Sequence, residues 1–407
     1  MSQTSEEQVL VAGAGPVGLS TALGLHARGV PARILEAEPE DRDRSGSRAI
    51  YVHNATLQTL NRIHPGLADE LVEEGLVWPT RRTMWRGETV FERTYPNPGG
   101  EGDLPHFSSI PQETTEEYMH RALEAAGIEI EWDSAVESVE SSETGVHVET
   151  SDGREWEAEY LVGADGGGST VRKEIGAEFD GDQSVNSFII ADVDEVEEDK
   201  WPLERLFHYD DPEVGGRNVM LVPFTGGWRL DIQCHEDDDP DELIKEDRMK
   251  EFVRAVMGEQ YVENVTWVSS YKFLQVMADT FLDEHRRVLL AGEAAHLIAP
   301  FGARGMNSGV ADADEAASAV AAAINANRPT ARSEEEMYAA RRETAAEYNR
   351  NAAGIALEYL QGDNPVINLR KEAAAAVAKH FEPAGEYLDD APYGPHTAPP
   401  IVTTGNY

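Results

Sequence analysis

The start of the chain shows apolar stretches separated by a glycine-rich turn. The segment QVLVAGAGPVGLSTALGLHARG, residues 8–29, opens on an apolar run and continues into a stretch rich in Ala and Leu, and PARILEAEPE follows at residues 31–40. A short apolar run bounded by glycines is typical of a buried strand, and the longer Ala- and Leu-rich stretch is typical of a helix. The pattern predicts a βαβ unit.

A second helix is predicted after Pro111 in the segment ETTEEYMHRALEAAG, which ends at Gly127. Thr114 and Thr115, followed by Glu116 and Glu117, have the residue types of an N-terminal cap. The next segment, EIEWDSAVESVE, predicts one strand over residues 129–140.

The pattern changes between about residues 185 and 275, where alternating apolar segments such as NVMLVPF and WRLDIQC are separated by acidic or glycine-rich turns. These features predict antiparallel strands of a second domain. After Arg287 the sequence RVLLAG, a loop and an Ala-rich helix near residues 311–326 restore the first pattern, so the first domain is predicted to be discontinuous. Residues 332–380 read as helices, and the Pro- and Gly-rich tail beyond Glu382 is expected to be ordered only by docking.

Acidic residues dominate the whole chain. The 407 residues include 76 Asp and Glu against 34 Lys and Arg, for a formal charge of -42, and only seven of the basic residues are Lys. Self-repulsion of this size destabilises a compact state at low ionic strength, whereas about 1 M salt shortens the Debye length to roughly 3 Å. We therefore predict a surface adapted to high salt.

The same composition limits the partners. An acidic surface lacks the Lys/Arg patches that bind nucleic acid or anionic membranes, which favours a small-molecule ligand. Cys234 is the only cysteine, so an intrachain disulfide or a cysteine-based metal site is excluded, and no metal is expected. The N-terminus lacks a basic signal region, and no apolar stretch approaches 18 residues, so the protein is expected to be cytoplasmic.

The turn after the first strand carries Gly13, Gly15 and Gly18 in the pattern GxGxxG, with Pro16 and Val17 between the last two glycines. Gly13 permits the tight turn, Gly15 lets a pyrophosphate approach the backbone, and Gly18 lets the helix pack on the sheet. Glu36, near the end of the next strand, is placed to accept hydrogen bonds from ribose hydroxyls. The unit predicts a dinucleotide site for FAD or NAD.

Two later segments distinguish these cofactors. YLVGADGGGSTVR contains Asp165, Gly166, Ser169 and Arg172, and RVLLAGEAAHLIAPFGARGMNSGVADA spans residues 287–313. With these motifs the chain, over roughly residues 8–325, resembles the class A flavoprotein monooxygenases, the family of para-hydroxybenzoate hydroxylase and phenol hydroxylase. In that family an Asp-Gly motif lies where FAD meets the nicotinamide cofactor, and a Gly-Asp motif binds the ribityl hydroxyls.

The resemblance implies a fold and a set of cofactor residues. The expected fold class is α/β, with a Rossmann-like FAD-binding domain of mixed sheet (residues 1–75, 101–182 and 284–345), an antiparallel-sheet substrate domain (76–100 and 183–283) and a C-terminal helical segment and tail (346–407). Arg48 in SGSRA resembles an arginine that reaches the FAD phosphates, and Gln112 resembles a glutamine whose amide contacts the cofactor. The expected FAD-binding residues are Gly13, Gly15, Pro16, Val17, Gly18, Glu36, Arg48, Gln112, Asp165, Gly166, Arg172, Gly292, Glu293, Pro300, Gly302, Gly305, Met306 and Asn307.

Two positions depart from the family. Its Gly-Asp becomes Gly292-Glu293, and its Gly-Gly becomes Gly302-Ala303, followed by Arg304. The first change lengthens a carboxylate that must meet the ribityl chain, and the second puts a methyl group where backbone approaches the flavin ring.

The activity implied by the resemblance is hydroxylation of a small aromatic, phenolic substrate with NAD(P)H and O2, through a C4a-hydroperoxide of non-covalently bound FAD, by a monomer or homodimer. Two alternatives stay open: an FAD-dependent reductase of the geranylgeranyl-reductase type, and a flavin-binding protein without turnover. Labelled oxygen in the product distinguishes a monooxygenase from the reductase.

The substrate pocket is less defined by sequence. Trp85, Met220, Phe224 and Trp228 are candidates for an aromatic-lined pocket. His53, His208 and Tyr271 are candidates for orienting or deprotonating a phenol, although a structural role is expected for each, so the catalytic residues stay unassigned. His296 is expected to brace the flavin loop.

Overall fold

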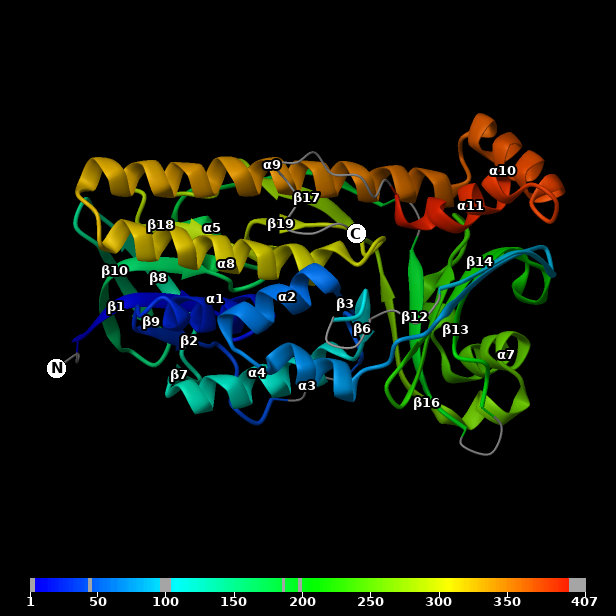
Figure 1. Cartoon of the computed structure of the whole chain (residues 1–407), viewed down its shortest axis with the longest axis horizontal. Coiled ribbons are helices and arrows are strands. Elements are labelled where there is room, and N and C mark those ends of the chain that lie inside the picture. The colour runs from blue at the N-terminus through cyan, green and yellow to red at the C-terminus, as the bar shows by residue number, and fades with distance from the viewer. Residues whose placement is uncertain (1–3, 43–45, 96–103, 185–186, 197–199, 395–407) are drawn as a thin grey trace.

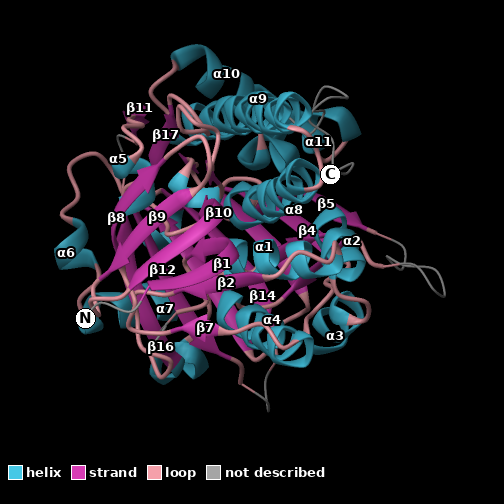
Figure 2. Cartoon of the chain, turned by 90° about the vertical axis from the view of Figure 1, so that its left-hand side faces the viewer, coloured by secondary structure: helices cyan, strands magenta, loops and turns pink. Residues whose placement is uncertain are grey.

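A mixed sheet forms the centre of one half of the molecule. The computed structural model describes residues 4–42, 46–95, 104–184, 187–196 and 200–394. The seven-stranded sheet has parallel strands at one side and antiparallel strands at the other (Figure 2). Its order is β7 (Ile130–Glu131), β2 (Ala32–Leu35), β1 (Thr4–Ala12), β10 (Glu155–Gly163), β9 (Val146–Thr150) and β8 (Val136–Ser141), with β18 (Val288–Leu290) also paired to β10.

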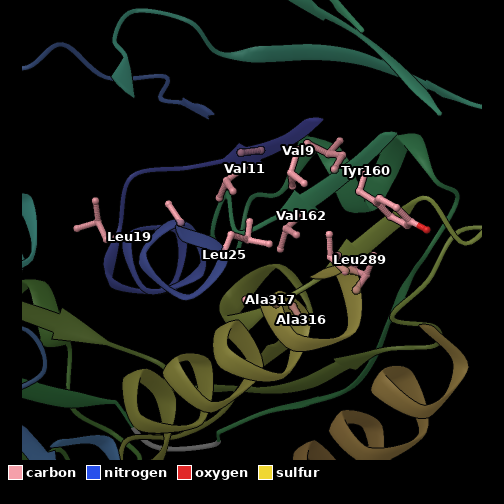
Figure 3. Close-up of a cluster of buried hydrophobic side chains, with 14 of the residues drawn as sticks. Val9, Val11, Leu19, Leu25, Tyr160, Val162, Leu289, Ala316 and Ala317 are labelled. Atoms are coloured by element: carbon pink, nitrogen blue, oxygen red, sulfur yellow. The ribbon is translucent and has the colours of Figure 1, made fainter. Parts of the chain in front are cut away.

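The parallel strands are buried on both faces. In β1, Val9, Leu10 and Val11 are all fully buried, as expected of a central parallel strand covered by helices. Figure 3 shows side chains of β1, β10 and β18 gathered near α1 (Pro16–Ala27) and α8 (Arg304–Ile324). The two helices pack closely at Gly24. A Cβ there would lie only 3.0 Å from Cβ of Ala317, so glycine permits this approach. The predicted βαβ unit is therefore present and α1 is enclosed.

A second seven-stranded sheet forms the other half. Its order is β16 (Val265–Tyr271), β12 (Phe188–Asp194), β15 (Gly227–Gln233), β14 (Arg217–Phe224), β13 (Glu204–Asp211), β4 (Thr80–Trp85) and β5 (Glu88–Thr94). All neighbours are antiparallel except β13 and β4, which run parallel because β4 and β5 enter from an earlier part of the chain. The short elements α6 (Pro240–Leu243), α7 (Glu246–Val256), η1 (Pro212–Val214) and η2 (Glu259–Asn264) complete this half.

Smaller elements connect the two sheets. A two-stranded sheet joins β3 (Tyr51–His53) to β6 (Phe107–Ser109), and a three-stranded sheet contains β11 (Phe179–Gln183), β17 (Leu274–Ala278) and β19 (His296–Leu297). The remaining elements of this part are α2 (Asn54–Ile63), α3 (Leu67–Glu74), α4 (Gln112–Ala126), α5 (Thr170–Glu174) and η3 (Gly292–Ala294).

The C-terminal part is helical. Helix α9 (Arg328–Gln361) runs beside α8 and reaches toward the second sheet (Figure 1), followed by α10 (Pro365–Val377), α11 (Glu382–Asp390) and η4 (Ala391–Tyr393). Helix α11 docks on the edge strands, where a Cβ at Gly385 would meet the ring of Phe91 at 2.1 Å. The mixed sheet, the largely antiparallel sheet and the terminal helices confirm the predicted fold class. The domain limits stay a prediction, and the one after residue 345 falls inside α9.

Two local predictions are wrong. The N-cap of α4 is Pro111 and no side chain caps it, because the helix begins at Gln112; Thr115 lies within the first turn, where its hydroxyl donates to the Pro111 carbonyl at 3.1 Å. Residues 129–140 form two strands, because the chain turns at Asp133, whose φ is +55°, and crosses from β7 at one edge of the sheet to β8 at the other.

Candidate active site

A cavity of about 1450 Å³ lies between the two sheets. Its wall includes Ala12 and Ala164, which end or follow β1 and β10, together with Phe188 and Ile190 of β12 and Met220 of β14. Ligands of open α/β sheets bind beyond the carboxyl ends of parallel strands. A typical small-molecule pocket has about 300–1,000 Å³, so this cavity is large enough for a dinucleotide and a second molecule.

The glycines of the first turn have separate tasks. A Cβ on Gly13, whose φ is +101°, would lie 2.4 Å from the Ala164 carbonyl oxygen, and a Cβ on Gly18 would lie 1.9 Å from the Gly13 carbonyl oxygen. Both glycines are therefore required by packing. Gly15 precedes α1 and lines the cavity with Pro16 and Val17, and nothing lies within 4 Å of its Cβ position. The open space at Gly15 leaves room for a phosphate at the helix N-terminus.

Glu36 is buried and follows β2. Its carboxylate accepts hydrogen bonds from the backbone N–H groups of Ala14, at 2.5 Å, and Glu38, at 3.0 Å. Glu36 therefore holds the glycine-rich turn in place. Because an ionised carboxylate has about four acceptor sites, the two remaining sites can accept from ribose hydroxyls at the cavity wall.

Asp165 and Gly166 line the cavity beside the glycine-rich turn, where a Cβ at Gly13 would lie 3.1 Å from Cα of Asp165. The Asp165 carboxylate accepts hydrogen bonds from the Ser169 hydroxyl at 2.5 Å and the Val171 N–H at 3.0 Å, so it caps the start of α5. Gly166 has a φ of +78°. The geometry therefore shows Asp165 shaping the loop, with its contact to a cofactor remaining an expectation.

Arg172 lies outside the cavity wall. Its guanidinium donates to the carbonyl oxygens of Gly167 and Ala294, both at 3.2 Å, and lies 3.6 Å from the centre of the Phe179 ring. Burial lowers the pKa of Arg172. This side chain joins the Asp165 loop to η3, which makes it a positioning residue for both.

Glu293 faces the cavity from η3. The preceding Gly292 has a φ of +62°, and a Cβ there would lie 2.7 Å from the Val17 side chain, so glycine is required. Surrounding protein raises the pKa of the Glu293 carboxyl by burial, against the opposing charges of His296 and Arg48. The structure thus places the longer acid in the position that the Gly-Asp comparison predicts.

A buried carboxylate supports the Glu293 turn from behind. Asp312 of α8 accepts from the Gly292 N–H at 2.9 Å, lies 2.7 Å from His296 Nε2, and accepts from Arg342 Nε at 2.5 Å. Burial opposes ionisation of Asp312, yet Arg342 and His296 hold its pKa below the ordinary value. His296 therefore belongs to the support of this loop.

The loop before α8 lines the cavity with Pro300 and Gly302, and the first turn of α8 lines it with Gly305 and Met306. Ala303, which replaces the family's second glycine, caps α8 with a φ of +52°. This is the left-handed region that favours glycine. Ala303 therefore holds a backbone conformation that glycine adopts at lower cost.

Asn307 does not line the cavity. Its side-chain oxygen accepts from the His53 N–H at 2.9 Å and the Thr56 hydroxyl at 2.7 Å, and its amide donates to the carbonyls of Tyr51 and Ala303. The bonds to Tyr51 and His53 tie α8 to β3, and the bond to Thr56 ties it to α2. Asn307 is therefore a positioning residue for the loop.

Arg48 and Gln112 both reach the wall. Arg48 is exposed, with a φ of +50°, and its carbonyl accepts a hydrogen bond from Arg229. Gln112 donates from its amide to Glu116 at 2.8 Å and from its backbone to the Ser47 carbonyl at 3.0 Å. The structure brings both residues to the same cavity as the glycine-rich turn.

Aromatic side chains form the other end of the cavity. The ring of Tyr51 stacks on Phe107 at 4.3 Å between centroids, and Trp78 lies 4.5 Å from Phe107. Of the four pocket residues predicted, only Met220 lines this cavity; the residues placed elsewhere are Trp85, Phe224 and Trp228. Trp228 is wrong for a pocket because it points into the core of the second sheet, where it is fully buried.

Two of the three candidate acid–base residues line the cavity and one does not. His208 lies off the cavity, held by Asp211 at 2.9 Å and by the Gly87 N–H at 2.8 Å. His53 lines the cavity with its Nε2 atom 3.1 Å from the Gly302 carbonyl oxygen, and Tyr271 lines it with 40% of its surface exposed. Only His53 and Tyr271 are therefore placed to contact a ligand.

Sequence reasoning missed Arg81, Arg205 and Tyr393, all of which line the cavity. Arg81 lies in β4, Arg205 in β13 and Tyr393 in η4, so hundreds of residues separate them along the chain. The parallel register of β4 and β13 makes Arg81 and Arg205 neighbours. No local sequence pattern identifies these residues, because strand pairing between distant segments brings them together.

Comparison with known families decides the assignment. The model of a family described as FAD binding domain matches residues 6–352. The chain belongs to this FAD-binding family. The resemblance to FAD-dependent monooxygenases and the FAD cofactor predicted from the sequence are thereby confirmed at the level of the family.

Several monooxygenases are similar to the chain. It is 28% identical over 376 residues to para-nitrophenol 4-monooxygenase of Pseudomonas sp. strain WBC-3, covering 90% of each protein. It is 33% identical over 323 residues to 6-methylpretetramide 4-monooxygenase of Streptomyces rimosus, covering 75% of this chain and 54% of that protein. The crystal structure of p-nitrophenol 4-monooxygenase from Pseudomonas putida DLL-E4 matches with a TM-score of 0.79 at 26% identity, covering 97% of this chain and 99% of that one.

The chain matches only part of several longer relatives. The chain spans 54% to 65% of the length of several curated relatives. Within the described ranges, no helix has the length and apolar character needed to cross a membrane. His, Cys, Asp and Glu side chains in the same ranges form no group of three that could hold a metal ion.

Proposed function

We propose that this protein is an FAD-dependent monooxygenase that hydroxylates a small aromatic substrate, a phenol in our expectation, with NAD(P)H and O2. The observation that carries the proposal is one continuous cavity, which joins the glycine-rich turn and Glu36 at one end to the aromatic residues Tyr51, Trp78 and Phe107 at the other. A cofactor held at the first end would present its reactive ring to a substrate at the second.

The residues present fit FAD. The open space at Gly15 and the N-terminus of α1 would hold the pyrophosphate, Glu36 would accept from the ribose, and Glu293 would accept from the ribityl chain. When bound, FAD supplies acceptance of hydride from NAD(P)H and activation of O2.

The chain's own contribution is positioning and electrostatics. Helix α8 begins at Arg304 on the cavity wall, so the partial positive charge of its N-terminus lies beside the Gly302 loop. Such a helix end stabilises negative charge that develops nearby. The apolar residues Phe107, Met220 and Val222 remove water from the substrate end.

The similar proteins named above are monooxygenases, which favours oxygen transfer over the reductase alternative. Family membership by itself does not fix the reaction, because a dialkyldecalin synthase of Streptomyces rugosporus is also 27% identical over 315 residues. A flavin-binding protein without turnover is disfavoured because the similar proteins named above are enzymes. We further propose a cytoplasmic monomer or homodimer.

Isotope labelling tests the proposal. The holoenzyme is screened with phenols, hydroxybenzoates and fused-ring phenols for stimulated NAD(P)H oxidation, and stimulating compounds are then turned over under ¹⁸O₂. The expected product carries one labelled oxygen atom. NAD(P)H oxidation that yields only labelled hydrogen peroxide with every compound, or a saturated product without label, would overturn the monooxygenase assignment.

A further inference from the structure

A group of side chains on the cavity wall lies outside the set of residues expected to hold FAD. We call Arg81, Arg205, Tyr51, Tyr95 and Tyr393 the arginine–tyrosine cluster; all five line the cavity. The Arg81 guanidinium lies 5.5 Å from the Tyr95 ring and 5.4 Å from the Tyr393 ring, and the Arg205 guanidinium lies 5.1 Å from the Tyr393 ring. The two arginines are therefore packed against aromatic faces.

Arg205 is buried with hydrogen-bonding capacity to spare. Only 1% of the residue is exposed, and its Nη2 atom donates to Asp389 at 2.7 Å. Among the described residues, neither its Nε nor its Nη1 atom has a hydrogen-bond partner, and the same holds for Nε of Arg81. Buried donors without partners are uncommon and costly, especially on a charged group. These donors therefore point to an acceptor that binds here.

The nearby carboxylates do not accept hydrogen bonds from these unpartnered arginine atoms. Asp389 is shared by both arginines, since it lies 2.5 Å from Nη2 of Arg81 and 2.7 Å from Nη2 of Arg205. Arg81 also contacts Asp390 at 2.7 Å, and that carboxylate is partly exposed. Asp389 itself does not line the cavity, whereas Arg81, Arg205 and Asp390 do. Arg81 and Arg205 therefore carry two positive charges on this part of the wall, against one negative charge from Asp390, in a chain whose formal charge is -42.

The cluster lies beside the loop that precedes α8. The Tyr393 carbonyl oxygen accepts from Arg304 at 3.2 Å and lies 3.0 Å from the Cβ position of Gly302. Tyr51 stacks on Phe107 at the aromatic end of the cavity. A ring held among these aromatic residues would thus have the unused Arg205 donors within the same compartment.

We propose that Arg205, with Arg81, binds a carboxylate on the aromatic substrate, so that the protein acts on an aromatic acid. The inference rests on the proposed function, since it names the substrate class of the same cavity. A guanidinium presents parallel N–H groups that match the two oxygens of a carboxylate, and its charge strengthens these bonds. A neutral aromatic compound would leave the Arg205 donors unsatisfied.

Matched ligand pairs test this proposal in the holoenzyme without turnover. Dissociation constants of benzoate against benzamide, and of 2-naphthoate against 2-naphthamide, are measured by calorimetry at one fixed KCl concentration, without NAD(P)H. We expect the acid of at least one pair to bind about tenfold to a hundredfold more tightly than its amide, the range of one charge-assisted hydrogen bond.

Variants assign the preference to the cluster. Arg205→Gln is expected to abolish most of the preference for the acid, and Arg205→Lys to keep part of it because the charge remains. Arg82→Gln is the matched control: Arg82 lies next to Arg81 on β4, outside the cavity, paired with Glu204 at 2.8 Å. The control should retain the full preference.

The proposal is wrong if amides bind as tightly as acids in wild type, if no acid binds at millimolar concentration, or if Arg205→Gln keeps the preference. The wild-type comparison stands even if Arg205→Gln fails to fold. Since no turnover is involved, failure of the ¹⁸O₂ experiment would overturn the monooxygenase assignment and leave the acid preference intact.

Discussion

A side chain at Gly15 is expected to impair cofactor binding without disturbing the fold. Its φ of -82° and ψ of -179° are accessible to any residue, and no heavy atom lies near its Cβ position. We therefore expect Gly15→Val to fold with an unchanged circular dichroism spectrum but to lose FAD on gel filtration, because the side chain fills the space for the pyrophosphate.

The matched variant is Gly18→Ala, whose Cβ would lie 1.9 Å from the Gly13 carbonyl oxygen and should damage the fold itself. Retention of FAD by folded Gly15→Val would show that the turn does not hold the pyrophosphate.

Glu293 offers a second residue-level test. Its carboxylate faces the cavity at the position expected to meet the ribityl chain. Removing a charged acceptor in Glu293→Ala costs about 1.5–3 kcal/mol, which weakens FAD binding by about tenfold to a hundredfold. Glu293→Asp should stay close to wild type.

FAD dissociation constants from fluorescence at fixed high salt decide the Glu293 question. Glu284→Ala controls for the loss of one negative charge, because that side chain is 86% exposed. Equal constants for Glu293→Ala and the control would remove Glu293 from the FAD site.

Single residues also show what could be predicted from the sequence. Gly13, Gly15, Gly18 and Glu36 lie close together along the chain, and their spacing alone indicated the turn and its acid. Arg205 gave no signal, because its neighbours Arg81, Asp389 and Tyr393 come from three distant segments. Long-range pairing, rather than local pattern, assembles the substrate end.

At the level of elements, Asp312 joins α8, η3 and α9 through a buried ionic contact. Replacing it with Asn removes the closer of the two carboxylates paired with the buried Arg342, the other being Glu315 at 3.4 Å, and a loss of about 1.5–3 kcal/mol in the free energy of unfolding is expected. Because the folded state lowers the Asp312 pKa, its stabilisation is fully present above about pH 4 and is lost as the pH falls further.

Chemical denaturation at neutral pH measures the Asp312→Asn loss. Asp314→Asn serves as control on the same helix, since Asp314 pairs with Arg28 and Arg62 nearer the surface and should cost about 1 kcal/mol or less. Equal losses in the two variants would contradict a special role for the Asp312 contact.

Elements were predicted well where one periodicity continued, as in β1, α1 and α8. The errors came at junctions. The strand predicted over residues 129–140 breaks at Asp133, because the chain leaves one edge of the sheet for the other, and the composition on both sides of the break is equally strand-like. The cap of α4 was misplaced because Thr-Thr-Glu-Glu imitates a capping sequence one turn inside the helix.

For the whole molecule, charge predicts the response to salt. Exposed ion pairs such as Arg121–Glu117 would be weakened by salt, but each contributes only about 0–1 kcal/mol. Repulsion among 76 acidic side chains opposed by 34 basic ones is the larger effect, and it is screened in the same range. The melting temperature should therefore rise from low to molar KCl. A flat or falling melting temperature would refute the adaptation to high salt.

The cavity between the two sheets is the central feature of the molecule, and its identity as an FAD site can be tested directly. The protein purified at high salt is precipitated with acid, and the released cofactor is separated by chromatography and quantified. We expect one FAD per chain in the supernatant, since no covalent attachment is predicted. Release of FMN or a nicotinamide dinucleotide without FAD, or failure of the folded apoprotein to take up FAD, would contradict the account.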